Sequence, residues 1–426
     1  MGVENQTRGE PRGDFERLRN RRETVEPRLK AGSPVRGALA AWRARGFVIF
    51  AVTISACKGH TPSDDLAAAA RPASSAADAA TIPAAAPASD ATILPGQNEA
   101  DFVVKDFHFT SGETLGEVRI HYATIGTRHR NAHGSVDNAI LLLHGTTGRA
   151  KAFFADPFRR EMFGPNQPFD ASKFFVVLPD NIGHGASSKP SDALHGRFPH
   201  YGYADMVQLQ HRLVVEGLGL THLHIVAGTS MGGMHAWMWT EAYPGFMDAA
   251  IPIAATPMAL SGRNLLWRRL VIEATRSDPA YNGGEYSHPP HGFVATLPLF
   301  YMMIDSTQHL ARVAPDLKSA TELLVGWAGT GHPILDANDA IYALDASRDY
   351  DPEPQIDKIS APVLAINFAD DEIVGPSIHE AQSVIMRVPR ARQIVVPATD
   401  ATRGHATLGL AAQWERPVVE FLAGLQ

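Results

Sequence analysis

The sequence predicts an α/β fold: a mostly parallel, doubly wound sheet interrupted by one helical insertion. Continuous apolar runs at residues 138–143 and 223–227 are typical of strands buried on both faces. A segment with helical spacing, residues 203–218, lies between them, and such alternation indicates helices on both faces of a parallel sheet. The alternation stops near residue 258, and strand character returns only at residues 363–367, which predicts a helical insertion in between.

The other elements are expected on the same grounds. Residues 102–110 and 117–123 alternate between apolar and polar side chains around a Ser-Gly pair, which predicts two strands joined by a turn. Further buried strands are predicted at residues 174–178 and 249–254, another strand at residues 393–396, and a closing helix at residues 408–422.

Composition excludes several classes of protein. The 426-residue chain is 45% hydrophobic with a formal net charge of -7, which is ordinary for a soluble, mildly acidic globular protein. A nucleic-acid-binding protein would usually be basic, so we expect no nucleic-acid partner. The single cysteine, Cys57, rules out an intramolecular disulfide and a cluster of thiolate metal ligands. No set of His, Asp and Glu residues has metal-site spacing, and we expect neither a metal nor a cofactor.

Residues 1–57 resemble an export signal rather than part of the fold. Arg43 and Arg45 precede an apolar run, residues 47–54, that is too short to span a membrane but fits a secretory signal. The run ends in Ile-Ser-Ala-Cys, similar to the lipobox of bacterial lipoproteins, in which the cysteine is lipidated. We therefore expect an exported, membrane-anchored periplasmic protein lipidated at Cys57. The alternatives are an uncleaved N-terminal anchor, or a fortuitous apolar run in a cytoplasmic protein.

Residues 58–97 are predicted to form a disordered linker. Ala, Pro, Ser and Asp dominate, and the few large apolar side chains cannot offset the entropy of ordering the chain. An alanine-rich helix is the alternative, but Pro72, Pro83 and Pro87 would interrupt it. One globular domain is expected over residues 98–426, with the helical insertion at about 259–352.

Residues 228–232, Gly-Thr-Ser-Met-Gly, fit the pattern G-x-S-x-G between a predicted strand and a predicted helix at residues 231–242. This is the context of a nucleophile elbow, in which Ser230 would sit on a sharp turn with its hydroxyl exposed at the strand's carboxyl end. The flanking glycines avoid a collision between a Cβ atom and the neighbouring backbones. A packing turn without chemistry is the alternative interpretation.

A nucleophilic serine needs a general base, and that base needs an orienting carboxylate. In folds with this elbow the chain order is serine, acid, histidine, with the last two on loops after late strands. The loop after residues 363–367 carries Asp370 and Asp371, and the loop after residues 393–396 carries His405. We expect His405 to be the base and one of the two aspartates to be the acid, the other being a turn residue bonded to its own backbone.

The negatively charged oxygen of an acyl-transfer intermediate needs preorganised donors. The backbone N–H of Met231, directly after the serine, is one expected oxyanion donor. The second should come from the loop after residues 138–143, where Thr146 is the best candidate. His144 and His184, in neighbouring loops, are interpreted as loop-shaping residues rather than catalytic ones.

Residues 203–210, Tyr-Ala-Asp-Met-Val-Gln-Leu-Gln, and residues 228–235 resemble the homoserine O-acetyltransferase family of α/β-hydrolases. Residues 137–141 and the Asp278-Pro279 pair are similar to that family as well. The resemblance covers roughly the whole globular part and implies the α/β-hydrolase fold, with the insertion lying over the elbow as a cap. The family's acid precedes a hydrophobic pair and prolines, and residues 370–376 match best with Asp371 as that acid.

Two departures from the family bear on the substrate. The family's catalytic histidine is followed by an aspartate that helps to hold the substrate ammonium group, whereas Ala406 follows His405 here. The family also clamps the substrate carboxylate with a cap arginine, and alignment on the Asp-Pro pair puts Ile272 at that position. The neighbouring arginines are Arg268, Arg269 and Arg276. Because a desolvated amino acid needs partners for both charges, homoserine is not the expected substrate.

We therefore expect a serine hydrolase that acts on a small-molecule acyl ester. The second hypothesis is an O-acyltransferase with the same acyl-serine intermediate, using an acyl-coenzyme A donor and an alcohol in place of water; an exported protein would lack ready access to acetyl-coenzyme A. The third is a non-catalytic surface lipoprotein on a hydrolase scaffold, which the presence of nucleophile, base and acid makes the weakest of the three.

Overall fold

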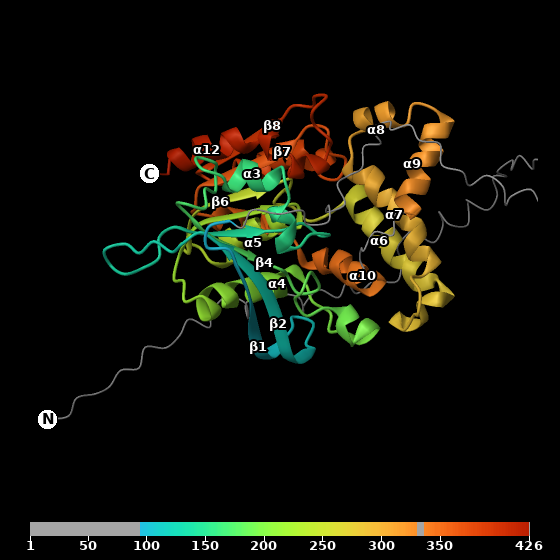
Figure 1. The fold of residues 1–426 in the computed structure, drawn as a ribbon, viewed down its shortest axis with the longest axis horizontal. Helices are drawn as coiled ribbons and strands as arrows, with labels where there is room; N and C mark the ends of the chain where they lie inside the picture. Colours follow the sequence, from blue (N-terminus) through green and yellow to red (C-terminus); the bar gives the residue numbers. More distant parts are fainter. Residues whose placement is uncertain (1–93, 330–335, 426) are drawn as a thin grey trace, which may run out of the picture. The chain divides into compact units, whose positions relative to one another are not determined.

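Eight strands form one sheet in the order β1-β2-β4-β3-β5-β6-β7-β8 in the computed structural model (Figure 1). Strands β3 to β8 run parallel, β2 is antiparallel to β4, and β1 is antiparallel to β2. The mostly parallel, doubly wound sheet that the sequence predicts is therefore confirmed. The structure describes residues 94–329 and 336–425. The predicted signal, Cys57 and all but the last four residues of the predicted linker lie outside the described residues.

The strands are β1 (Asn98–His108), β2 (Thr114–Ile125), β3 (Ala139–Leu143), β4 (Phe175–Pro179), β5 (Leu223–Thr229), β6 (Met247–Ile253), β7 (Val363–Phe368) and β8 (Ala391–Val396). The α-helices are α3 (Phe158–Phe163), α4 (Tyr203–Arg212), α5 (Met231–Ala242), α6 (Gly262–Ser277), α7 (His291–Ile304), α8 (Thr307–Val313), α9 (Leu317–Gly329), α10 (Ala337–Asp345), α11 (Ile378–Ile385) and α12 (Glu415–Ala423).

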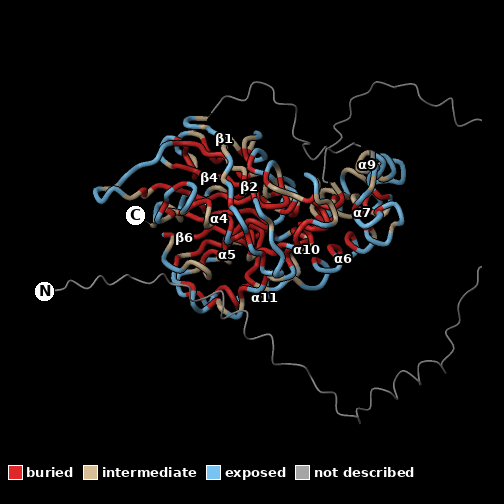
Figure 2. Tube along the Cα trace, turned by 90° about the horizontal axis from the view of Figure 1, so that it is seen from below, coloured by how far each residue is buried: buried red, intermediate tan, exposed pale blue. Residues whose placement is uncertain are grey.

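The central strands are apolar throughout because each of them presents side chains to two cores. In β3, Leu141 and Leu143 pack into one buried cluster with residues of α4, α5 and α11. Ile140 and Leu142 point to the other face and pack with residues of α3 and α12. Successive side chains of a strand point to opposite faces, so a strand between two helical layers must be apolar throughout. Figure 2 shows the resulting buried interior, with exposed chain mainly at its periphery.

The prediction of one closing helix over residues 408–422 is wrong in its first half. Two short 3₁₀ turns, Ala406–Gly409 and Ala411–Gln413, precede α12, which begins only at Glu415. Pro417 gives the reason, because it fits the first turn of a helix but would clash with the preceding turn in a helix interior. Trp414 is buried at the break, and its indole N–H donates to the carbonyl of Thr407.

Helices α6 to α10 lie between β6 and β7 in the chain and pack on one another (Figure 1). The insertion contacts the sheet through loops that follow strands. Asp339 in α10 accepts hydrogen bonds from the backbone and side chain of Ser191, in the chain after β4. Asp305, at the end of α7, accepts one from Arg403, in the loop after β8. Because β4 and β8 are parallel, both contacts lie at the carboxyl edge of the sheet.

Over the described part of the chain, no helix combines the length and the apolar character needed to cross a membrane.

Candidate active site

Ser230 lies on a strained turn between β5 and α5. Its backbone has a φ of 53° and a ψ of -115°, a region that residues with a Cβ atom rarely occupy. The turn is closed by glycines that allow backbones to touch: a Cβ at Gly228 would collide with the backbone of Gly232, and one at Gly232 would collide with the backbone of Leu143. Strain of this kind at a single residue is typical of a functional position rather than of a packing turn.

The structure brings Ser230, His405 and Asp371 into one continuous hydrogen-bonded chain. The Nε2 atom of His405 lies 2.8 Å from the Oγ atom of Ser230. The Nδ1 atom of the same ring lies 2.6 Å from Oδ2 of Asp371. All three side chains are buried, with 8%, 6% and 3% of the surface of Ser230, His405 and Asp371 exposed, so water competes little with these bonds.

Asp370 and Asp371 are adjacent in sequence but bond to different parts of the structure. Oδ1 of Asp371 accepts backbone hydrogen bonds from Ile373 and Val374 at 2.7 and 2.9 Å, which holds Oδ2 toward His405. The Asp370 carboxylate instead accepts from the Thr402 hydroxyl at 2.8 Å and from the Gly404 backbone at 3.1 Å. Asp371 therefore contacts the imidazole, whereas Asp370 holds the loop that carries it.

The loop after β3 lies against Ser230. A Cβ atom at Gly145 would be 3.3 Å from the Cβ atom of Ser230, so the loop backbone and the serine nearly touch. The N–H of Thr146, the next residue, makes no hydrogen bond within the described part of the chain. The N–H of Met231 is in the first turn of α5 and has no acceptor within that helix. Two backbone N–H groups that lack an acceptor within the described chain thus belong to the residue after Ser230 and to the loop that contacts it.

His144 and His184 lie outside the chain of bonds that contains Ser230. Nδ1 of His144 contacts the carbonyl of Gly145 at 2.8 Å, and Nε2 of His184 contacts the carbonyl of Thr146 at 2.8 Å. Burial lowers the pKa of His144 to about 4, and burial also lowers the pKa of His184. The His144 ring is therefore neutral at physiological pH, and both rings contact the loop backbone.

Arg268, on α6, is a buried arginine near Tyr203 that the alignment on the Asp-Pro pair did not select. Ile272, at the aligned position, is buried, while Arg268 is 2% exposed and Arg269 and Arg276 face solvent. Among the described residues, no carboxylate forms an ion pair with Arg268, and its Nη1 atom has no hydrogen-bond partner. The one sequence signal is the spacing of Asn264 and Arg268, four residues apart, since Asn264 accepts from the Arg268 Nε atom.

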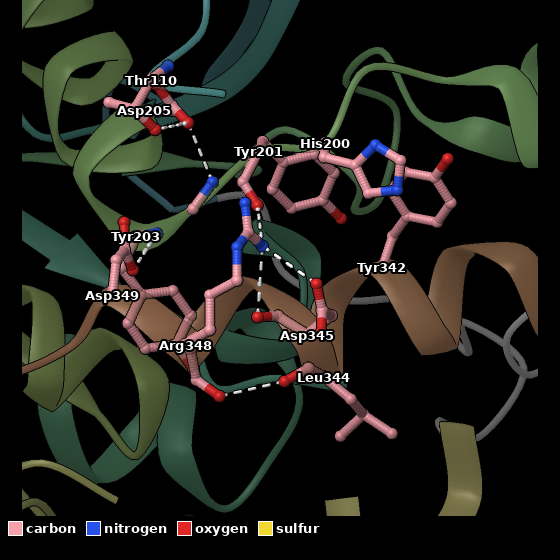
Figure 3. Close-up of polar contacts among 12 residues, drawn as sticks. Thr110, His200, Tyr201, Tyr203, Asp205, Tyr342, Leu344, Asp345, Arg348 and Asp349 are labelled. Atoms are coloured by element: carbon pink, nitrogen blue, oxygen red, sulfur yellow. Dashed lines mark hydrogen bonds and ion pairs between the residues drawn. The ribbon is translucent and has the colours of Figure 1, made fainter. Parts of the chain in front are cut away.

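Tyr203 lies near both Arg268 and the loop beside Ser230, and its hydroxyl has no hydrogen-bond partner among the described residues. Burial raises the pKa of the Tyr203 hydroxyl, and the Arg268 guanidinium and the Thr146 hydroxyl lie close enough to oppose that rise. The backbone N–H groups of Tyr203 and Ala204 donate to Asp349, at 2.9 and 3.1 Å, which fixes the start of α4 (Figure 3). Asp205 bonds Thr110 nearby and secures the same turn.

A pocket of about 210 Å³ lies next to these residues. Its lining includes Met234, one helical turn after Ser230, Ile373 and Val374, which bond to Asp371, and Asn264, which bonds to Arg268. Within the described ranges, no cluster of three or more His, Cys, Asp or Glu side chains could hold a metal ion.

Comparison with known proteins places the chain in a family. Residues 138–399 match the family described as the alpha/beta hydrolase fold. A probable acyltransferase of Methanothermobacter thermautotrophicus is 25% identical over 325 residues, which cover 76% of this chain and 97% of that protein. A homoserine O-acetyltransferase of Solidesulfovibrio magneticus is 36% identical over 200 residues, which cover 43% of this chain and 49% of that protein. The chain thus aligns with only about half the length of that transferase.

A solved structure has the same fold. The crystal structure of an acetylester hydrolase from Corynebacterium glutamicum superposes with a TM-score of 0.66 at 22% identity, covering 76% of this chain and 96% of that one. The protein belongs to the α/β hydrolase fold family. It is an enzyme of that fold: its sequence relatives include acyltransferases, and it shares its fold with an acetylester hydrolase.

Proposed function

We propose that the protein is a serine hydrolase that cleaves a small-molecule carboxylic ester through an acyl-serine intermediate. The observation that supports this most directly is the chain of short hydrogen bonds from Ser230 through His405 to Asp371. A serine with a base on its hydroxyl and a carboxylate behind that base is the arrangement that activates an otherwise weak nucleophile.

In the proposed acylation step, Oγ of Ser230 attacks the ester carbonyl carbon while its proton moves to Nε2 of His405. The carbonyl oxygen becomes an oxyanion, which accepts hydrogen bonds from the N–H groups of Met231 and Thr146. As the intermediate collapses, the imidazolium gives its proton to the departing alkoxide, and the alcohol leaves. Asp371 holds the imidazole in the tautomer that can accept the serine proton, and it stabilises the imidazolium.

In the proposed deacylation step, a water molecule replaces the alcohol. His405 takes one proton from the water while the water oxygen attacks the acyl carbon. The N–H groups of Met231 and Thr146 hold the second oxyanion as they held the first. Collapse breaks the bond between the acyl carbon and Ser230 Oγ, and His405 returns the proton to that oxygen. The products are a carboxylic acid and the free enzyme.

The nucleophile is tested with a covalent probe and a pair of serine variants. Ser230→Ala should abolish hydrolysis of aryl esters and labelling by a fluorophosphonate. Ser277→Ala is the matched control, because Ser277 is exposed at the end of α6, and its hydroxyl donates to the Ala274 carbonyl at a long distance of 3.4 Å. Continued labelling of the Ser230→Ala protein would overturn the assignment of the nucleophile.

An O-acyltransferase is the second candidate, and the burial of Arg268 favours it. A buried guanidinium without a carboxylate partner is costly, and a carboxylate on the substrate would satisfy it with paired hydrogen bonds. An acceptor alcohol that carries a carboxylate would fit this requirement, as would an ester with a carboxylate on its alcohol part. Ala406, which follows His405, offers no charge to an ammonium group.

The two candidates are separated by products. Acetyl-coenzyme A is offered with a hydroxy acid, with the methyl ester of that hydroxy acid, or with water alone, and the acetylated products are quantified. Transfer to the free acid, lost in Arg268→Met but kept in Arg269→Met, would establish the transferase. Arg269 is the matched control because it is exposed on the same helix and is paired with Glu273 and Asp345. Release of acetate at the same rate with all three additions would instead show that water is the acceptor, and the protein would be a hydrolase.

A further inference from the structure

A buried chain of polar side chains leads from α5 to the loop beside Ser230. The indole N–H of Trp239 donates to Oε1 of Gln210 at 2.7 Å, and Nε2 of Gln210 donates to Oδ1 of Asn181 at 2.6 Å. Nδ2 of Asn181 then lies 3.2 Å from Nε2 of His144. Every member is at most 2% exposed, and the mechanism proposed above uses none of these side chains.

The chemistry of its members permits one orientation of this chain. An indole N–H can only donate, so Trp239 sets which end of the Gln210 amide is oxygen. The NH₂ end of Gln210 therefore faces Asn181, whose oxygen must accept and whose NH₂ must point to His144. The same Gln210 nitrogen lies 3.0 Å from Nδ1 of His235, which must then be an acceptor.

His144 receives hydrogen bonds on one side of its ring and gives one on the other. The backbone N–H of Asn181 donates to its Nε2 atom at 3.1 Å, beside the Asn181 amide. Because burial lowers the pKa of His144 to about 4, the ring is neutral and has only one N–H. That proton must be on Nδ1, which donates to the carbonyl of Gly145 at 2.8 Å.

The carbonyl of Gly145 and the N–H of Thr146 belong to one planar peptide group and point in opposite directions. A hydrogen bond that fixes the carbonyl therefore fixes the direction of the N–H. It also polarises the peptide, which strengthens the N–H as a donor. Without the bond from His144, the turn bond from the N–H of Gly148 alone would hold this carbonyl.

We infer that His144 is a positioning residue for the oxyanion donor, and that Asn181, Gln210 and Trp239 hold its ring in the tautomer that donates to Gly145. This inference rests on the proposed function, because it assigns the N–H of Thr146 to the oxyanion. The four side chains form a relay. Through it, the direction of the Thr146 N–H depends on the amide of Gln210 in α4 and on the indole of Trp239 in α5.

Two substitutions of His144 separate the relay from simple packing. His144→Asn keeps an N–H group near the position of Nδ1, and His144→Gln keeps a polar group near the position of Nε2 only. We expect His144→Gln to lower kcat for an aryl ester by about 30- to 100-fold, with KM within about 3-fold. His144→Asn should retain kcat within about 5-fold of the wild type, although both variants lose thermal stability.

Binding of a transition-state analogue supplies the readout that packing alone would not change. An alkyl boronic acid, which forms a tetrahedral adduct with the serine, should bind His144→Gln more weakly by the same factor as kcat falls. Thr240→Val is the matched control, because it removes a buried hydrogen bond to the Trp237 carbonyl in α5 without touching the relay. It should lose stability while its boronic acid affinity stays unchanged.

Equal losses of kcat in His144→Asn and His144→Gln, or unchanged boronic acid affinity in His144→Gln, would overturn the relay. Failure of the proposed function is a different result, since wild-type protein would then neither hydrolyse esters nor bind the boronic acid. In that event the tautomer still tests the relay. Long-range ¹H–¹⁵N spectra should show the His144 proton on Nδ1 from pH 6 to pH 8, and a proton on Nε2 would refute the inference.

Discussion

Exchanging the carboxylate of Asp371 for an amide tests the proposed triad most sharply. In Asp371→Asn the retained oxygen can still accept from Ile373 and Val374, so the loop keeps its bonds. The NH₂ group then faces Nδ1 of His405, which stands 2.6 Å from the native Oδ2 atom. Two donors cannot share that position, so the imidazole must carry its proton on Nε2 and can no longer accept the proton of Ser230.

The expected loss follows from the wrong tautomer. An amide behind the base of a serine triad lowers kcat by about 10,000-fold. At about 1.4 kcal/mol for each factor of ten, this corresponds to about 5 kcal/mol of lost transition-state stabilisation. The assay is kcat/KM for an aryl ester, with thermal unfolding followed by circular dichroism to establish that the variant is folded.

Asp370→Asn is the matched control on the adjacent residue. The native Asp370 carboxylate accepts two hydrogen bonds on Oδ2, and an amide oxygen in that place can accept both. Its Oδ1 atom has no partner among the described residues, so an NH₂ group there displaces no bond. Activity should stay within about 5-fold of the wild type, because the loop is held as before. A larger loss in Asp370→Asn than in Asp371→Asn would refute the assignment of the acid.

Three further outcomes are expected. Burial raises the pKa of Glu241 from 4.5 to about 7, so the folded state loses stability as pH rises between these values. In urea titrations, the unfolding free energy of Glu241→Gln should therefore rise relative to that of the wild type by about 2–3 kcal/mol from pH 5 to pH 8. A difference between the two proteins that is the same at both pH values would contradict this. Arg403→Gln breaks a 2.6 Å ion pair with buried Asp305 and should lower the unfolding free energy by about 3 kcal/mol in the same titration. Arg312→Gln breaks an exposed ion pair with Asp400 and should lower it by less than about 1 kcal/mol. Equal losses would contradict the claim that the buried pair matters more than the exposed one. Mass spectrometry of the mature N-terminus should find a lipidated Cys57, and an unmodified Cys57 preceded by intact upstream residues would end the lipoprotein proposal.

The sequence alone determined the fold class and the place of the elbow. Both depend on local signals: continuous apolar runs are required of strands that contact two helical layers, and glycines at 228 and 232 are required where backbones touch. The same local reasoning failed at the last helix, because Pro417 belongs in the first turn of a helix, and α12 begins only at Glu415 within residues 408–422.

Only the tertiary structure decided which residues act together. Asp370 and Asp371 have the same side chain and neighbouring positions. The family resemblance favoured Asp371 as the acid, but only the packed structure shows that Asp371 bonds His405, 34 residues further along the chain, while Asp370 bonds the loop before it. Arg268 is distinguished from Arg269 by burial, and His144 is distinguished from a surface histidine by its bonds to Gly145 and Asn181. Direction, burial and hydrogen-bond partners arise when distant segments pack, so no pattern within one segment of the sequence contains them.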